Sequence, residues 1–160
     1  MDHAKSAVLL TEEALLPETN QPLMLETFLA APILAWIGRH LLAEGVQRIF
    51  VACAPEFAEA ARACLPEEAE ATVSDLREDL LRFLDTPEPV LVLCRSALPM
   101  KEAGPGFAYA AAGTDLRRAW RERLTHAVPE AEPVGGWLPV YGPETLAELE
   151  EVFRSRGLEP

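Results

Sequence analysis

Polar side chains that could contact a ligand follow two apolar runs of the sequence. Thr11-Glu12-Glu13 comes directly after Ala7–Leu10, and Arg95-Ser96 comes directly after Val90–Cys94. Both runs are typical of buried β-strands, and ligands of parallel sheets bind beyond the carboxyl ends of the strands. We therefore expect the arginine and the serine to be possible ligand contacts. The two glutamates either ligate a cation or, as we favour, form a solvated acidic turn.

No glycine-rich phosphate loop follows the first run. The first glycine of the chain is Gly38, which already lies inside the helix expected from Pro32. A loop that cradles phosphate needs backbone that can approach the ligand closely and turn its N–H groups inward. Thr11–Pro17 instead carries Glu12 and Glu13, whose charge would repel a triphosphate.

Nucleophilic and acid–base chemistry have few candidates. No anion-binding Cys-x5-Arg loop begins at Cys94, and we interpret Cys94, Cys53 and Cys64 as buried structural cysteines. His40 and His126 fall near the ends of expected helices, where the helix dipole favours a cation. We therefore interpret both histidines as caps rather than as catalytic residues.

Two further features could bind a partner or ligand. The expected helix Asp115–Ala127 is rich in arginine and could hold a phosphate, although we favour pairing with neighbouring glutamates. Trp137 follows Gly135-Gly136 beside the expected ligand edge and is a possible ligand contact, whereas Trp36 and Trp120 are expected to anchor the core.

Composition restricts the classes of function. The chain has 160 residues, 49% hydrophobic and 25% charged, with a formal net charge of −12, which indicates one globular domain over residues 1–160. An acidic surface without a basic stripe predicts neither nucleic acid nor anionic membrane as a partner. Three cysteines at no metal-ligand spacing indicate reduced thiols in a cytoplasmic protein. The N-terminal sequence is not typical of a signal peptide, and no apolar run reaches the roughly 18–20 residues of a membrane span.

Apolar periodicity predicts strands and helices in alternation. Strands are expected at Ala7–Leu10, Arg48–Cys53, Ala69–Val73, Val90–Cys94 and, in short or distorted form, Val134–Val140. Helices are expected at Pro32–Glu44 (ended by Gly45), Pro55–Leu65, Leu76–Leu84 (capped by Ser74), Asp115–Ala127 and Pro143–Arg156. Residues 95–114 are expected to be irregular between these elements. The order predicts an α/β, three-layer, Rossmann-like fold with a mostly parallel sheet of about five strands and helices on both faces.

The order of these segments resembles the sugar-phosphate nucleotidyltransferases, which include N-acetylglucosamine-1-phosphate uridylyltransferase and the molybdenum-cofactor guanylyltransferases. In those families a strand and a Gly-rich loop precede Pro-Lys-x-Leu and Gly-Lys-Pro segments, a later strand ends in Gly-Asp-x-Pro, and Val-Asn/Asp-Thr-Pro-Glu-Asp-Leu opens a last helix. The corresponding segments here are Ala7–Leu10, Pro22–Leu25, Ala30–Leu34, Leu91–Pro99 and Val140–Glu150. The resemblance implies the nucleotide-diphospho-sugar transferase type of fold, shortened in its acceptor-binding region.

The resemblance also implies which positions would carry the chemistry. Nucleotidyl transfer depends on phosphate charge being neutralised by amides, cations and Mg²⁺. Leu23 and Ala31 stand in the two lysine slots, Ala97 stands in the metal-binding aspartate slot, and Tyr141 stands in the second metal-ligand slot. We therefore expect a vestigial nucleotide site without catalytic residues, metal or cofactor, made of Thr11, Glu12, Leu23, Ala31, Ala97 and Tyr141.

Three functional hypotheses follow. The favoured one is a nucleotidyltransferase-like protein without catalysis, retained for binding or for a protein partner. The second is a divergent active nucleotidyltransferase that uses Arg95 and the Glu12-Glu13 pair with Mg²⁺ on a sugar phosphate or similar acceptor. The third is an interaction module with an exposed apolar patch around Trp137, which would form a homo-oligomer.

Overall fold

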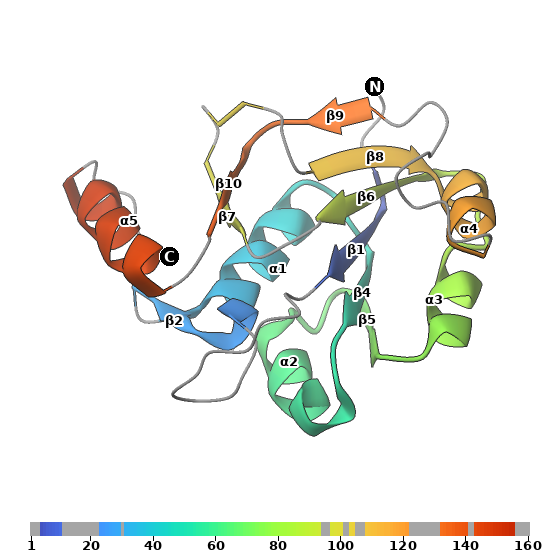
Figure 1. The fold of residues 1–160 in the computed structure, drawn as a ribbon, viewed down its shortest axis with the longest axis horizontal. Coiled ribbons are helices and arrows are strands. Elements are labelled where there is room, and N and C mark those ends of the chain that lie inside the picture. The colour runs from blue at the N-terminus through green and yellow to red at the C-terminus, as the bar shows by residue number, and fades with distance from the viewer. Residues whose placement is uncertain are drawn as a thin grey trace.

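A computed structural model describes residues 4–10, 23–29, 31–93, 97–100, 103–104, 108–121, 132–140 and 143–155. Figure 1 shows a twisted central sheet between helices. In spatial order its strands are β5 (Glu70–Ser74), β4 (Arg48–Ala52), β1 (Ser6–Leu10), β6 (Pro89–Leu93), β8 (Ala108–Ala112) and β9 (Glu132–Val134). The α-helices are α1 (Ile33–Ala43), α2 (Ala58–Cys64), α3 (Arg77–Phe83), α4 (Gly113–Arg121) and α5 (Pro143–Ser155).

The main sheet is mostly parallel, as predicted. β5, β4, β1 and β6 run in the same direction, and β8 pairs with its neighbours β6 and β9 in the antiparallel sense. β1 lies in the middle, where Val8 is level with Phe50 of β4 and with Val92 of β6. Parallel neighbours require crossover connections, and the helices that make them cover both faces of the sheet.

Side-chain alternation along the strands separates two cores. In β1, Ala7 and Leu9 face the core that contains α1, whereas Val8 faces the core that contains α3 and α4. The same alternation in β6 places Leu91 in the first core and Val92 in the second. Because side chains of a strand point alternately to opposite faces, these apolar runs indicate strands buried on both sides.

Helix α1 ends where the sequence predicts a stop. Gly45 has a φ of 95°, a left-handed conformation that glycine adopts at little cost. The N–H of Val46 donates to the carbonyl of Leu41 at 2.9 Å, and the N–H of Gly45 donates to that of Leu42 at 3.1 Å. This pair of bonds is a Schellman motif, which turns the chain into β4 and packs Val46 near the last turn of the helix.

Two small sheets and one helix start differ from the prediction. β2 (Thr27–Phe28) pairs with β3 (Ala31–Pro32), and β7 (Ala97–Pro99) pairs with β10 (Trp137–Pro139). The expectation of irregular chain at 95–114 was therefore wrong for β7, β8 and the start of α4. The main sheet consequently has six strands where about five were expected. Helix α3 has Leu76 as its N-cap, not Ser74.

Within the described segments, no helix combines the length and the apolar character that crossing a bilayer requires.

Candidate functional site

The carboxyl edge of the parallel strands is the place where the sequence predicts a ligand. In the described part of this edge, Cys53-Ala54 follows β4 and Asp75 follows β5. No lysine or arginine stands among these residues. Thr11, Glu12, Arg95, Ser96 and Tyr141 lie outside the described residues, so their predicted roles remain predictions.

Cys53 is a structural cysteine, as predicted. Its side chain is buried, and its thiol donates to the carbonyl of Ala54 at 3.6 Å. Burial, and in addition the negative charge of Asp75, raise the pKa of the Cys53 thiol. The thiol is therefore protonated at neutral pH and is a poor nucleophile.

Cys64 was expected to be buried, and this expectation was only partly right. Cys64 is half-buried at the end of α2, where its thiol donates to the carbonyl of Ala60 at 3.3 Å. Partial burial raises the pKa of this thiol as well. Cys94, the third cysteine, lies outside the described residues.

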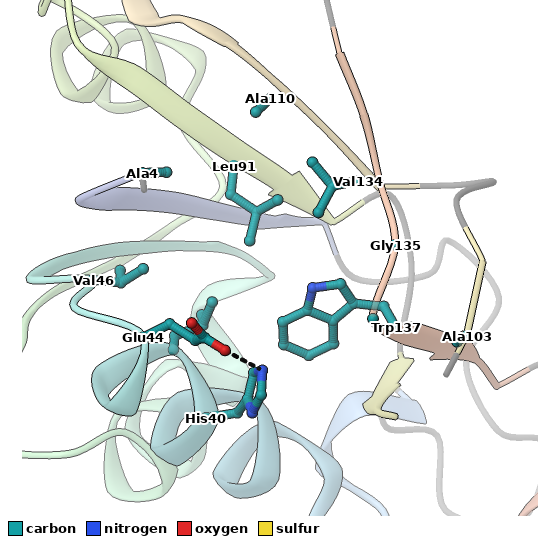
Figure 2. A pocket seen from close by; sticks show the side chains of 12 residues that line it. Ala4, His40, Glu44, Val46, Leu91, Ala103, Ala110, Val134, Gly135 and Trp137 are labelled. Carbon is teal, nitrogen blue, oxygen red and sulfur yellow. Dashed lines mark ion pairs between the residues drawn. The ribbon is translucent and has the colours of Figure 1, made fainter. Parts of the chain in front are cut away.

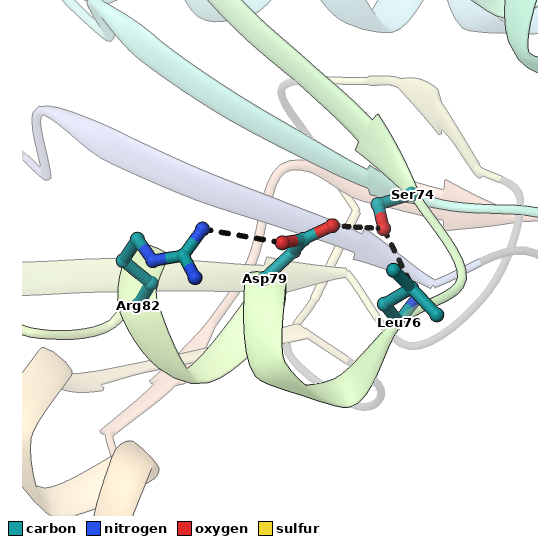
Figure 3. A network of polar contacts seen from close by, with 4 residues as sticks. All are labelled: Ser74, Leu76, Asp79 and Arg82. Atoms are coloured by element: carbon teal, nitrogen blue, oxygen red, sulfur yellow. Dashed lines mark hydrogen bonds and ion pairs between the residues drawn. The ribbon is translucent and has the colours of Figure 1, made fainter.

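Polar groups where β5 meets α3 are used within the protein (Figure 3). The hydroxyl of Ser74 donates to Oδ2 of Asp79 at 2.6 Å and accepts from the N–H of Leu76 at 3.0 Å. Arg82 pairs with Oδ1 of Asp79 at 3.3 Å. Helix α3 begins at Arg77 with Leu76 as its N-cap, so the hydroxyl of Ser74 closes a tight turn before the helix rather than capping it.

The alanines in two predicted nucleotide slots hold structural positions. Ala97 is the first residue of β7 and lies opposite Pro139 of β10. Its side chain is fully buried in the apolar core between α1 and the sheet. Ala31 is half-buried in β3, opposite Phe28. Leu23 opens a short 3₁₀ turn, η1 (Leu23–Leu25). All three segments contact α1, so the structure gathers them around one helix.

Two arginines of α4 form polar contacts inside the protein. Nε of Arg117 donates to the carbonyl of Leu81 at 3.1 Å, and Arg118 pairs with Asp115 at 3.2 Å. These contacts favour pairing inside the protein, as we expected, over a phosphate grip for these two arginines. The carboxylate partner of Arg118 is an aspartate of its own helix rather than the neighbouring glutamate that we expected.

A cavity of about 610 Å³ lies on the α1 face of the sheet (Figure 2). Its floor is the side of the sheet formed by β6 and β8, and the last turn of α1 and strand β10 form two of its walls. It is lined by Ala4, His40, Leu41, Glu44, Val46, Leu91, Ala103, Ala110, Val134, Gly135, Gly136 and Trp137. Ala4 and Val46 form a further wall of the cavity. Because they precede β1 and β4, this wall lies at the opposite end of these two strands from their carboxyl edge.

The polar groups of the cavity come from α1 and β10. Nε2 of His40 lies 3.5 Å from a carboxylate oxygen of Glu44, one helical turn further on. The rings of His40 and Trp137 meet edge to face, with centroids 5.1 Å apart and an interplanar angle of 84°. Among the described residues none accepts a hydrogen bond from the indole Nε1–H of Trp137, and Figure 2 shows this nitrogen on the side of Leu91.

Two residues that line this cavity were singled out in the sequence, His40 and Trp137. The prediction of His40 near the C-terminal end of its helix is confirmed. Trp137 is buried at 4% exposure, so the expected exposed apolar patch around it is wrong. The cavity itself was missed by sequence reasoning. Two features of the sequence belong to this cavity: the four-residue spacing of His40 and Glu44, and the Gly-Gly-Trp segment that ends at Trp137. Nothing in the order of the chain predicts that these two features lie side by side.

The described residues do not fit the magnesium ion that nucleotidyl transfer needs. In the segments that the structure describes, no three His, Cys, Asp or Glu side chains lie close enough to hold a metal. The buried methyl group of Ala97 supplies no oxygen ligand, whereas Mg²⁺ requires carboxylate, phosphate or water oxygens.

Comparison with known proteins supports the fold. No protein-family model matches the sequence, and no curated protein matches it significantly. Among solved structures, the inositol-1-phosphate CTP transferase from T. maritima matches with a TM-score of 0.62 and 12% sequence identity, over 99% of each chain. The chain therefore has the α/β fold of a nucleotidyltransferase, and this likeness concerns the fold alone.

Proposed function

We propose that this chain is a nucleotidyltransferase-like protein that no longer transfers nucleotides and that acts by binding, with a protein partner or a second copy of itself. In this proposal the resemblance to the uridylyltransferases and guanylyltransferases of sugar and cofactor metabolism reflects descent of the scaffold. The protein acts in the cytoplasm and needs no metal or cofactor.

The observation that supports this proposal best is the complete burial of Ala97. In the resemblance this position corresponds to the metal-binding aspartate, yet the structure uses it as a core residue with no exposed side-chain area. A single lost oxyanion or phosphate donor typically costs an enzyme about 2.7–4 kcal/mol of transition-state stabilisation. Ala31 stands where the resemblance places a catalytic lysine. Its half-buried methyl group carries no charge and cannot neutralise phosphate.

The charge balance supports the same conclusion. The whole chain has a formal net charge of −12, and its two lysines are Lys5 and Lys101. Neither lysine occupies the two slots where the resemblance places the catalytic lysines. A triphosphate that approached the described part of the carboxyl edge would meet Asp75 and a neutral thiol rather than cations.

A release assay for pyrophosphate tests the proposal. The purified chain is incubated with Mg²⁺, each of the four ribonucleoside triphosphates and a panel of sugar 1-phosphates. We expect pyrophosphate to stay at the level of a control without protein. Release above that control, abolished in Arg95→Ala, would overturn the proposal in favour of a divergent enzyme that uses this arginine.

The association state tests the binding half of the proposal. Light scattering coupled to size-exclusion chromatography measures whether the chain forms a defined dimer or a complex with a candidate partner. A protein that stays monomeric and retains no partner in pull-down experiments would contradict a role by protein–protein binding.

A further inference from the structure

The cavity between α1 and β10 has the size and lining of a small-molecule site. Its volume of about 610 Å³ falls within the roughly 300–1,000 Å³ that ligand pockets occupy. The floor is apolar, since Leu91 and Ala110 project from the sheet there, and Val46 continues it beside α1 (Figure 2). Such a surface favours the apolar body of a ligand over water.

The charges around the cavity select the sign of the ligand. Of the described residues that line it, His40 and Glu44 are the ionisable ones, and none is a lysine or arginine. The Glu44 side chain keeps 52% of its surface exposed, so its carboxylate can accept a second partner besides His40. Both groups lie at the C-terminal end of α1, where the helix dipole favours cations and disfavours anions.

Trp137 adds a hydrogen-bond donor and an aromatic surface. The indole Nε1–H has no acceptor among the described residues and lies on the Leu91 side of the ring. The Trp137 side chain is otherwise buried and lines the cavity, so this N–H is placed to donate to a polar atom of a ligand there. The ring itself can attract a cation placed near its face.

We propose that this cavity binds a small organic amine, with the ammonium group at Glu44 and the apolar body on Leu91 and Trp137. This inference goes beyond the proposed function, because the wall formed by Ala4 and Val46 lies away from the carboxyl edge of β1 and β4. Binding here does not depend on whether the chain transfers nucleotides.

Three probes with one phenyl body and different charges test the inference. These are 2-phenylethylamine, 2-phenylethanol and phenylacetate, each titrated into ¹⁵N-labelled full-length protein. The readout is the indole N–H resonance of Trp137, which the variant Trp137→Phe assigns among those of the other tryptophans. We expect a saturable shift with the amine, with a dissociation constant of about 1 mM or tighter, and binding of phenylacetate at least about tenfold weaker.

Matched variants localise the charge effect. Glu44→Gln keeps the shape of the side chain and removes its charge, so the amine should lose its preference over the alcohol. Glu148→Gln, an exposed glutamate of α5, removes the same charge elsewhere and should leave the preference unchanged. Equal affinity for the amine and the carboxylate, a preference that survives Glu44→Gln, or no saturation by the amine at about 20 mM would overturn the inference.

Discussion

Ala97 shows how one residue decides between two descriptions of the same position. A vestigial metal slot would still be open to solvent, whereas a core position is closed. In the structure Ala97 and its neighbour Leu98 have no exposed surface, and both belong to the apolar core between α1 and the sheet. The position therefore contributes packing, and introducing the aspartate that the resemblance implies here should damage the fold rather than create a site.

Replacing Ala97 with aspartate tests this assignment. An unpaired carboxylate in the core should lower the free energy of unfolding by about 3 kcal/mol or more. Ala147→Asp, on an exposed position of α5, is the matched control and should cost no more than about 1 kcal/mol. Urea denaturation measures both. If Ala97→Asp is as stable as the control, or if Mg²⁺ restores its stability, the slot is still open.

The two described cysteines should differ in reactivity. Cys64 is half-buried, whereas Cys53 is 5% exposed and its pKa is raised by burial and by Asp75. Alkylation by iodoacetamide at pH 8, followed by peptide mass spectrometry, should modify Cys64 first.

The carboxylate of Asp75 disfavours the Cys53 thiolate, so Asp75→Asn should lower the pKa of Cys53 and speed its alkylation. Glu78→Gln, on the exposed face of α3, is the matched control and should leave the rate unchanged. Faster reaction of Cys53 than of Cys64 in the unmodified chain would contradict this assignment.

At the scale of elements, α5 is attached by three aromatic rings. Phe153 of α5 meets Phe28 and Trp36 edge to face, at centroid distances of 5.0 and 6.0 Å. The indole N–H of Trp36 donates to the carbonyl of Phe28 at 2.8 Å, and the backbone N–H of Leu29 donates to Glu150 at 3.1 Å. These contacts join the last helix to α1 and to the β2–β3 hairpin.

Truncating Phe153 should therefore loosen the last helix. Phe153→Ala should cost about 3–5 kcal/mol, the range for large buried aromatic side chains. Its sequence neighbour Val152 is 38% exposed, and Val152→Ala should cost less than about 1 kcal/mol. Thermal and urea unfolding measure both variants, and amide exchange shows whether α5 opens before the sheet. Equal costs would mean that the aromatic contacts do not anchor α5.

The elements that could be predicted share a strong periodic pattern. β1, β4 and β6 have apolar residues on both faces, and α1 has a glycine stop, so local sequence was sufficient. β8 reads Ala-Tyr-Ala-Ala-Ala, which has little β-propensity, and it forms because β6 and β9 pair with it on either side. β7 and β10 have three residues each, too few to show any period.

At the scale of the whole molecule, the fold could be predicted and the cavity could not. The strand–helix order fixed the α/β class because parallel strands need crossovers, and this class agrees with the structure of the CTP transferase. The cavity joins the end of α1, the middle of β6 and the start of β10. His40 and Trp137 are far apart in the chain, and their ring contact depends on the antiparallel pairing of β10 with β7. No local pattern encodes such a contact.

The formal net charge of −12 is a property of the whole molecule that affects how it meets an anionic ligand. A nucleotide-binding protein must offset the charge of a triphosphate locally, with cations, amides or Mg²⁺. The described part of the carboxyl edge contains Asp75 and the raised-pKa thiol of Cys53, and it contains none of these cations. We therefore expect nucleoside triphosphates to be repelled, with or without divalent metal.

Calorimetric titration of the full-length chain with each ribonucleoside triphosphate, with and without Mg²⁺, measures this expectation. We predict no saturable heat in the presence of Mg²⁺ beyond that of buffer and metal alone, at triphosphate concentrations up to about 1 mM. A saturable, Mg²⁺-dependent heat with a defined stoichiometry would contradict our proposal that this chain has a nucleotidyltransferase fold without nucleotide chemistry.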